Sequence, residues 1–454
     1  MDKALVRCDN GKPAFRYAGA FGEDTWDPVK DMCLNGVVFA DLALKPGAYE
    51  IKYCQSPIYV TEDYFRGIYS GKLLVSELNR SDLSEFRFVW ELICNGKTVQ
   101  SGELENIRLG SGERLKLDIP YDRALVQGES FITFRVLRRE ATEFAPAGDT
   151  VYLTQWKAEG SVTYSESPAL WSDTPLETIR TDSGLKILAG DTEILFSKEN
   201  GGLCCAKNGK ILLFGGKTEV FRAPTGIDET ANSNSTLTDW RENGLISPDW
   251  KTENFNVFNS ETAVFAEEAL SALEGKLRVR RSYTVTAKGI RITTRVANGV
   301  GIETLARIGQ SFVLPAEFEN LEWYGRGPHE SYCDRKESAV FGIYQSKVKD
   351  QHENFVRPCE CGGHEDTRWL RVTDGSGCGI EICGNFHFSA LPWSIEQYTA
   401  AEYADELGES HGTNLVLDGF SAGLGGDTGW DKVIHPEYRI PDGNYIYELE
   451  LRWL

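Results

Sequence analysis

Residues Phe86-Arg87-Phe88-Val89-Trp90-Glu91-Leu92-Ile93-Cys94 run directly into Asn95-Gly96. Apolar side chains recur at every second position of this stretch, at Phe86, Phe88, Trp90 and Leu92. A period of two is typical of a strand with one buried face. Asn-Gly suits the positive φ angles of a type I′ turn, so residues 97–104 are predicted to return as the second strand of a hairpin. This stretch predicts a mainly β fold.

Further strand patterns follow the hairpin at Phe131–Leu137 and Val151–Trp156. Residues 56–162 therefore predict one small β-sandwich of immunoglobulin size. Residues 163–180 are rich in Ser and Pro and are predicted to be a linker.

The region 181–454 is again patterned as strands. Arg278–Thr286 and Ile290–Ala297 are predicted to pair across a short turn. The last strand alternates two sets of residues, Tyr445, Tyr447, Leu449, Leu451 and Trp453 against Ile446, Glu448, Glu450 and Arg452. About 270 residues without a convincing linker predict one large, many-stranded β-sandwich. Residues 1–55 fit neither sandwich and are too short to bury a core alone.

The net charge of the chain limits the classes of partner that it is expected to bind. With 48 Lys and Arg against 68 Asp and Glu, the net charge is −20 over 454 residues. Such an acidic surface repels phosphate backbones and anionic lipid, which argues against nucleic acid or a membrane as partner, whereas a neutral carbohydrate meets no such repulsion. Residues 1–7 contain no apolar run, and no run of about eighteen apolar residues occurs in the chain. Together with the odd count of 11 cysteines, these features predict a cytoplasmic protein with reduced thiols.

A glycine-rich loop stands out near the C-terminus, with five glycines in the eleven residues 419–429, directly before Trp430. A Trp on such a loop offers a flat apolar face with a polar N–H at its edge, a surface that suits a sugar ring. The alternative is a tight turn with a core Trp, and the loop by itself does not decide between the two.

Several motifs occur in one order along the chain. They are Asp9-Asn10-Gly11-Lys12-Pro13, Cys33-Leu34-Asn35-Gly36-Val37-Val38-Phe39-Ala40-Asp41, Arg222-Ala223-Pro224-Thr225, Trp323-Tyr324-Gly325-Arg326-Gly327-Pro328-His329-Glu330-Ser331-Tyr332-Cys333-Asp334-Arg335, Arg357-Pro358-x-Glu360, Thr367-Arg368-Trp369 and Gly425-Gly426-Asp427-x-x-Trp430. In this order and spacing, essentially the whole chain resembles the C-terminal part of the large bacterial β-galactosidases of glycoside hydrolase family 2. The stretch from Trp323 to Arg335 is the most specific match.

The resemblance implies a fold for each region. Residues 1–55 would be the last part of a catalytic (β/α)8 barrel, residues 56–162 an immunoglobulin-like β-sandwich, and residues 181–454 a galactose-mutarotase-like supersandwich. Retaining hydrolysis needs two carboxylates about 5 Å apart, and in the family both glutamates lie upstream of the part present here. No catalytic residue is therefore expected in this chain, and its many Asp and Glu residues are interpreted as solvated surface.

The resemblance assigns binding residues instead. Trp430 matches a Trp that stacks on sugar at the mouth of the pocket. Asn35, through its side chain, and Met32, through its backbone carbonyl, match the ligands of a sodium ion beside the galactose 6-hydroxyl, and such oxygens suit a hard cation. Asn35-Gly36 could also be merely a turn. Sodium is thus a candidate cofactor here, and magnesium is expected in the partner chain.

Three departures from the family pattern leave the glycoside specificity open: Ala18-Gly19-Ala20-Phe21-Gly22-Glu23, Gly226-Ile227-Asp228 and Cys361-Gly362. Cys359, Cys361 and His364 have the residue types of a zinc site but lack a clear fourth ligand. All six His lie in the last domain at irregular spacings, which favours structural or surface roles over a shared site.

We therefore expect a subunit of a split family-2 glycoside hydrolase, a β-galactosidase that hydrolyses terminal β-D-galactosides with retention. A large catalytic chain would supply the rest of the barrel, residues 1–55 would complete it, and the interface would be large and obligate within an oligomer. The alternative is a non-catalytic carbohydrate-binding or scaffolding protein, although such a module has no reason to keep Cys33-Leu34-Asn35-Gly36. A truncated product of a longer gene is a third possibility.

Overall fold

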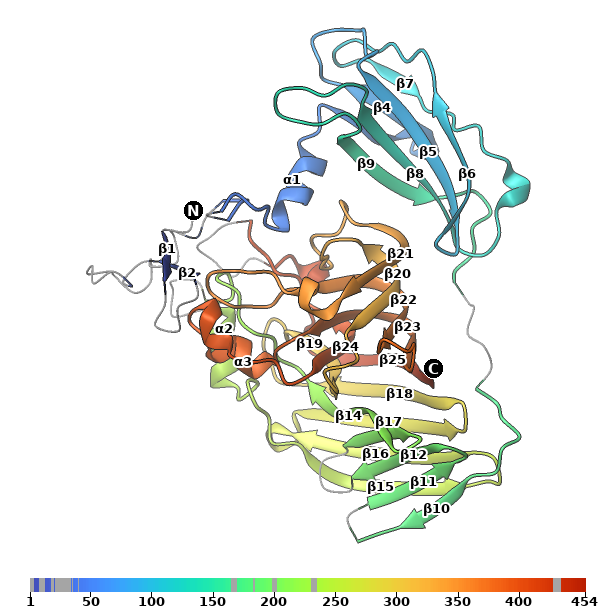
Figure 1. The fold of residues 1–454 in the computed structure, drawn as a ribbon, viewed down its shortest axis with the longest axis vertical. Helices are drawn as coiled ribbons and strands as arrows, with labels where there is room; N and C mark the ends of the chain where they lie inside the picture. Colours follow the sequence, from blue (N-terminus) through green and yellow to red (C-terminus); the bar gives the residue numbers. More distant parts are fainter. Residues whose placement is uncertain are drawn as a thin grey trace.

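The computed structural model describes residues 4–7, 13–17, 20, 34, 36–39, 41–164, 170–182, 184–197, 202–229, 235–427 and 434–454. Two small sheets lie at the top of Figure 1, and one large curled sheet fills its middle and lower parts. Helix α1 (Gly47–Cys54) lies between the two regions. The mainly β fold that the sequence predicts is confirmed.

The small sheets enclose a core of their own. One has the order β3-β4-β7 and the other β6-β5-β8-β9. Their strands are β3 (Ile58–Phe65), β4 (Ile68–Ser76), β5 (Phe86–Cys94), β6 (Lys97–Leu104), β7 (Arg114–Lys116), β8 (Ser130–Arg138) and β9 (Thr150–Lys157). The predicted hairpin is confirmed, because β5 pairs with β6 across Asn95 and Gly96, whose φ angles are +46° and +81°. Phe88, Trp90 and Leu92 point into the shared core as the alternation predicts.

The large sheet contains sixteen strands among the described residues, and thirteen of them follow the order β10-β11-β12-β13-β14-β19-β24-β23-β25-β18-β17-β16-β15. Its strands are β10 (Glu177–Arg180), β11 (Gly184–Ala189), β12 (Thr192–Ser197), β13 (Leu203–Lys207), β14 (Lys210–Glu219), β15 (Lys251–Asn259), β16 (Val264–Ala272), β17 (Leu277–Thr286), β18 (Gly289–Asn298), β19 (Arg307–Leu314), β20 (Asn320–Gly327), β21 (Val340–Lys347), β22 (Gly363–Thr373), β23 (Gly379–Leu391), β24 (Thr413–Ser421) and β25 (Gly443–Trp453). Strand β10 falls within the stretch 163–180 that the sequence predicts to be a linker. The domain boundaries stay a prediction.

Short helices occupy the connections of the large sheet. They are α2 (Thr236–Glu242), α3 (Ile395–Ala400) and the 3-10 turns η3 (Leu273–Gly275), η4 (Val348–Gln351), η5 (Ala404–Leu407) and η6 (Pro436–Tyr438), with η2 (Arg123–Leu125) in the small sheets. Ser394 caps α3 by accepting a hydrogen bond from the backbone of Gln397, whose side chain accepts one from the Ser394 backbone in return. No described helix is long and apolar enough to cross a membrane.

Strand β23 divides the large sheet into two layers. Its first half, residues 380–384, pairs with β25, and its second half, residues 387–391, pairs with β24. The branches that continue from β24 and from β25 share one apolar core. The hairpin predicted at residues 278–297 is confirmed as β17 and β18, and β25 joins that branch beside β18.

The N-terminal segment is described only in part. Strands β1 (Ala4–Arg7) and β2 (Pro13–Arg16) form a two-stranded antiparallel sheet, and α1 follows. The strands of a (β/α)8 barrel are parallel, and this hairpin adds no support to the barrel. The assignment of residues 1–55 to the end of a barrel therefore stays a prediction.

The interpretation of the acidic residues as solvated surface is wrong for an important group of them. Glu129, Asp228, Glu268, Glu330, Glu360 and Asp418 are only 0–7% exposed. Each faces an arginine, and those arginines are Arg368, Arg222, Arg281, Arg335, Arg307 and again Arg307. A composition of 26% charged residues cannot reveal such pairs, because composition does not say which charged side chains the fold buries.

Candidate functional site

The motif Trp323–Arg335 folds as strand β20 and the loop 328–338 that follows it. Trp323 is 1% exposed in the core, and its indole N–H donates to the Arg326 carbonyl at 3.0 Å. Arg326 in turn donates to the carbonyls of Lys336 and Ala339, each at 2.8 Å. The strand therefore holds both ends of the loop 328–338, so the polar residues between them have fixed positions.

The loop 328–338 holds the glycine-rich loop that leaves β24. The Asp334 carboxylate accepts a hydrogen bond from the Gly425 N–H at 2.7 Å. A Cβ atom at Gly423 would lie 2.4 Å from the same carboxylate, so only glycine allows this close approach. Gly425 and Gly426 have φ angles of +74° and +114°, which glycine adopts without strain.

A buried arginine fixes the other side of the glycine-rich loop. Arg222, from the Arg-Ala-Pro-Thr motif, donates from Nη1 to the carbonyls of Ala422 and Gly423 at 3.2 and 3.1 Å. Its remaining nitrogens bind both oxygens of Asp228 at 2.8 and 3.1 Å, and Arg222 and Asp228 are each 1% exposed. Burying a bidentate pair costs much desolvation free energy, but its geometry is specific. We therefore infer that the pair positions the loop rather than stabilises the fold.

More buried charges lie under the root of this loop. Arg307 on β19 donates to Glu360 and lies 3.6 Å from the Asp418 carboxylate on β24. Burial raises the pKa of Asp418 to about 6. Next to it, His387 on β23 contacts Glu365 through Nδ1 at 2.9 Å. Burial lowers the pKa of His387, but Glu365 outweighs that effect and the pKa is raised above its usual value.

We call this region the polar end: the loops 328–338, 357–362 and 422–427 with the buried side chains of Arg222, Asp228, Arg307, His387 and Asp418. A cavity of about 20 Å³ beside Arg307 and Glu360 has room for about one water molecule. These buried side chains are therefore closed off from a sugar. In chemical terms, the described part of the polar end positions a loop rather than reacting with a substrate.

The N-terminal segment reaches the same end of the sheet. Arg16 on β2 forms an ion pair with Asp405 at 2.8 Å, and its guanidinium lies over the Tyr403 ring. The Phe39 ring packs against Phe355 with centroids 5.6 Å apart. Phe355 packs against the cluster that contains Cys361, so the segment that the resemblance assigns to a barrel reaches the neighbourhood of the loop 357–362.

All three site residues predicted from the sequence, Trp430, Asn35 and Met32, lie outside the described residues. The glycine-rich loop is described as far as Asp427, which contacts His435 at 2.5 Å. Near the predicted sodium site, the carbonyl of Leu34 accepts a hydrogen bond from Lys45 at 2.8 Å. The assignment of Trp430 to sugar and of Asn35 and Met32 to sodium stays a prediction.

The residues considered for zinc have other partners. His364 contacts the Gln351 side chain at 2.5 Å, stacks on Phe388 and packs at a tilt against Trp323, while Cys361 is fully buried. In the described part of the chain, no group of three His, Cys, Asp or Glu is arranged to hold a metal ion. Burial raises the pKa of the Cys361 thiol well above its usual value, so the metal-binding thiolate is disfavoured there.

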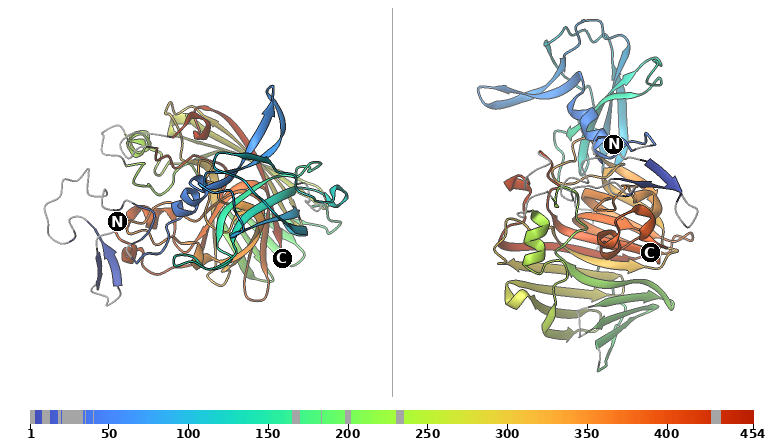
Figure 2. Two further views of the ribbon diagram at one scale, coloured as in Figure 1. Left: turned by 90° about the horizontal axis from the view of Figure 1, so that it is seen from above. Right: turned by 90° about the vertical axis from the view of Figure 1, so that its left-hand side faces the viewer.

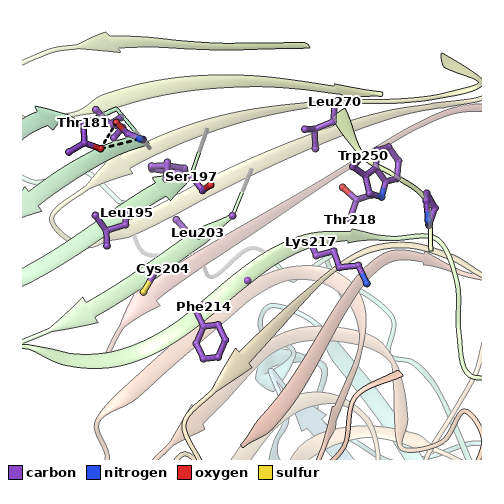
Figure 3. Close-up of a pocket in the computed structure, with 16 residues that line it drawn as sticks. Thr181, Leu195, Ser197, Leu203, Cys204, Phe214, Lys217, Thr218, Trp250 and Leu270 are labelled. Atoms are coloured by element: carbon purple, nitrogen blue, oxygen red, sulfur yellow. Dashed lines mark hydrogen bonds between the residues drawn. The ribbon is translucent and has the colours of Figure 1, made fainter. Parts of the chain in front are cut away.

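A concave surface lies elsewhere on the large sheet, and we call it the apolar end. It is a groove of about 720 Å³ between β11–β14 and β16. In Figure 3, Leu195, Leu203 and Phe214 lie on one side of the groove, and Thr218 and Trp250 lie on the other. The sequence predictions name none of these residues.

Sequence reasoning did not identify Arg307, Glu365 or Asp418. It also did not predict that Arg222 anchors the glycine-rich loop or that Asp334 accepts the Gly425 N–H. Arg222 and Asp334 do stand inside quoted motifs, so their position in those motifs was an available signal. Arg307 and Asp418 stand at ordinary strand positions, and only pairing between β19 and β24 brings them together.

Comparison with known families identifies the family to which this chain belongs. A family described as beta galactosidase small chain matches residues 189–451, more than half of the chain, and beta-galactosidase domain 4 matches residues 74–159. The chain belongs to the beta-galactosidase small chain family.

Individual relatives can be aligned with almost the whole chain. A beta-galactosidase of Priestia megaterium is 28% identical over 97% of this chain, and one of Streptococcus thermophilus is 27% identical over 97%. The chain spans only 42% of the length of each of these two relatives. Among solved structures, a galactose mutarotase-like protein from Lactobacillus casei aligns over 62% of this chain and 100% of its own, with 8% identity and a TM-score of 0.31. A score this low carries no conclusion about function.

Proposed function

We propose that this chain is the small subunit of a family-2 glycoside hydrolase that hydrolyses terminal β-D-galactosides with retention. A larger partner chain would carry both catalytic glutamates and most of the barrel. The observation that carries the proposal is the full-length match to beta-galactosidases of which this chain spans only 42–44%. In this assignment the chain supplies a wall of the substrate pocket and the surfaces of assembly.

The pocket wall would be the glycine-rich loop with Trp430. The anchoring by Arg222 and Asp334 supports this role, because a stacking platform is useful only if its loop has a defined position. Asn35 and Met32 would hold a sodium ion beside the sugar, and magnesium would be bound by the partner chain. A cytoplasmic location is supported by the nine described cysteines, which are all free.

The proposal is tested by assaying a chromogenic β-galactoside with this chain alone, with the large chain alone, and with both together. We expect hydrolysis only in the mixture, because two catalytic carboxylates and the pocket wall would come from different chains. Hydrolysis by this chain alone would refute the proposal that the partner chain carries both catalytic glutamates. Galactose binding without activity in the mixture would favour a carbohydrate-binding protein instead.

Trp430→Ala tests the pocket wall in the active mixture. We expect KM to rise about tenfold, which corresponds to a loss of about 1.4 kcal/mol of binding, with a smaller change in kcat. Trp171→Ala is the matched control, since Trp171 is exposed and lies beside the stretch between the two sandwiches. Equal KM values for Trp430→Ala and the wild type would show that Trp430 is only structural.

The sodium ligands are tested in the same assay by replacing sodium with potassium. We expect the wild-type mixture to lose substrate affinity without sodium, and Asn35→Ala to lose that dependence because an oxygen ligand has been removed. A sodium response that is unchanged in Asn35→Ala would exclude Asn35 as a ligand.

A further inference from the structure

Helix α1 connects the N-terminal segment to the loop that anchors Gly425. The helix has eight residues, and Glu50 in its first turn points toward the loop 328–338. The Glu50 carboxylate accepts hydrogen bonds from the backbone N–H groups of Glu337 and Ser338, both at 3.2 Å, and from the Ser338 hydroxyl at 2.8 Å. One side chain thus binds three donors of the loop 328–338.

A ring contact strengthens the same junction. Tyr49 stacks on His329 with centroids 4.3 Å apart and planes 15° apart. The His329 ring also contacts the Ser338 hydroxyl at 2.9 Å, which joins both ends of the loop to α1. On its other side the helix contacts the small sheets, where Tyr53 stacks on Tyr152 at 5.5 Å. Helix α1 is therefore held between the two β regions.

The loop 328–338 carries this contact onward to the glycine-rich loop. Asp334 lies between the residues that α1 contacts and accepts the Gly425 N–H at 2.7 Å. Within the same loop, Arg335 pairs with Glu330, and Glu330 accepts the Gly362 N–H at 2.6 Å. The path from Glu50 to Gly425 thus consists of direct hydrogen bonds and one short loop.

We propose that Glu50 and Asp334 are positioning residues that couple the N-terminal segment to the glycine-rich loop. The inference rests on the proposed function, because docking of the large chain on residues 1–55 would then fix α1 and, through the loop 328–338, the loop that leads to Trp430. Assembly would in this way complete the pocket wall at the moment when the catalytic carboxylates arrive. Chains of packed side chains and hydrogen bonds of this kind carry energetic coupling between sites, which a coupling measurement can detect.

The first test uses hydrogen exchange of the isolated chain and needs no enzyme activity. We expect Glu50→Ala to speed exchange in residues 421–427 by about tenfold, since three hydrogen bonds that fix the loop 328–338 are lost. Lys52→Ala is the matched control, because Lys52 lies on the same helix and instead contacts Asp149 at 3.2 Å. Unchanged exchange in Glu50→Ala would overturn the proposal.

A double variant separates coupling from general loosening. If Glu50 acts through Asp334, Glu50→Ala should add almost nothing to the faster exchange of Asp334→Ala. Additive effects would mean that the two residues act independently, and the proposal would fail. If Glu50→Ala does not fold, Ser338→Ala removes the hydroxyl donor from the same junction and is tested in its place.

The second test adds the large chain. We expect its binding to slow exchange of residues 421–427 in the wild type and much less in Glu50→Ala, and the assembled Glu50→Ala enzyme to have a KM several-fold higher at nearly unchanged kcat. Equal slowing in both proteins would overturn the coupling. If the mixture shows the exchange effects but hydrolyses no galactoside, the proposed function fails while the coupling stands.

Discussion

The two ends of the large sheet differ in what they bury. The apolar end has a groove of about 720 Å³ lined by side chains such as Leu195, Leu203 and Phe214. One buried ion pair, Arg281 with Glu268, lies beside it, and Arg281 donates to Thr218 in the groove lining. At the polar end a cavity of about 20 Å³ lies beside Arg307, and the region buries several arginines and carboxylates. The larger cavity and the higher density of buried charge thus lie in different parts of one sheet.

The difference separates stability from positioning. Apolar burial stabilises a fold in proportion to area and needs no special geometry, whereas a buried ion pair gives little net stability but demands fixed partners. The polar end is also where loops from residues 328–338, 357–362 and 422–427 meet. We therefore take the polar end, and not the larger groove, as the region that organises function.

Arg307→Met should produce the largest change. It leaves Glu360 and Asp418 buried without their cation, so we expect the free energy of unfolding to fall by about 3–5 kcal/mol. Urea denaturation measures it. The control is Arg371→Met, whose side chain is 42% exposed beside Glu322 and Glu381, and which should cost less than about 1 kcal/mol. Similar losses in the two variants would remove the distinction between buried and exposed charge.

Leu203→Ala tests the apolar end. Leu203 is 3% exposed in the core beside the groove, so we expect a loss of about 2–3 kcal/mol, because the groove can partly collapse around the smaller side chain. Exchange of residues 421–427 and the KM of the assembled enzyme should stay at wild-type values. A raised KM would mean that the apolar end also contributes to the site.

Two carboxyl groups whose pKa is raised in the folded protein, Glu353 and Asp418, each contribute a pH dependence of stability with a definite sign. Burial, with the nearby charge of Glu330, raises the pKa of Glu353 from 4.5 to about 7, and burial raises that of Asp418 from 3.8 to about 6. The folded protein therefore holds protons that the unfolded chain releases, so these groups make stability fall as pH rises from about 4.5 to about 7.

Glu353→Gln isolates that contribution, since the amide resembles the protonated acid. We expect the variant to lose less stability than the wild type between pH 5 and pH 7 in urea denaturation series. Glu267→Gln, at an exposed position on β16, serves as the control and should follow the wild-type curve. Parallel curves for Glu353→Gln and the wild type would contradict the shifted pKa.

Gly423→Ala should have the smallest effect on stability and a local effect on the site. Its Cβ would meet the Asp334 carboxylate at 2.4 Å and displace it from the Gly425 N–H. We expect faster exchange in residues 421–427 and a KM raised several-fold in the assembled enzyme. Gly226→Ala is the matched control, because a Cβ there meets nothing within 4 Å. Indistinguishable behaviour of the two variants would show that Asp334 does not fix the loop.

Much of the fold could be predicted because the signals are local. The period of two in residues 86–94 and the turn at Asn95-Gly96 gave β5 and β6, and the same reasoning gave β17 and β18. In β25 the alternation holds for Tyr447 and Leu449, but Glu450 and Arg452 on the other face are also buried. They are buried because Arg291 and Glu381 pair with them, and those partners lie on neighbouring strands.

The polar end could not be predicted because its contacts are not local. Arg222 and Gly423 are 201 positions apart, and Arg307 and Glu360 are 53 apart. No periodicity relates such residues, and the pairing of β14 with β19 and of β19 with β24 is what brings Arg222 and Arg307 to the root of the glycine-rich loop. Motif resemblance did identify the segments involved. It gave Trp430, Asn35 and Met32 as binding residues, and these remain predictions to be tested.

The most direct measurement is an experimental structure of the chain assembled with its large partner and a bound galactoside. The account predicts that the sugar lies against Trp430, with the glycine-rich loop still held by Arg222 and Asp334 and with the catalytic carboxylates contributed by the partner. A sugar bound in the groove of Figure 3, or in the partner's pocket without contact to the loop 422–430, would contradict it.

The position of the arm formed by β3 and β4, which projects from the small sheets in Figure 2, can be compared in the same structure, but the contact between Trp430 and the sugar decides the outcome. The account stands if that contact is present and fails if it is absent.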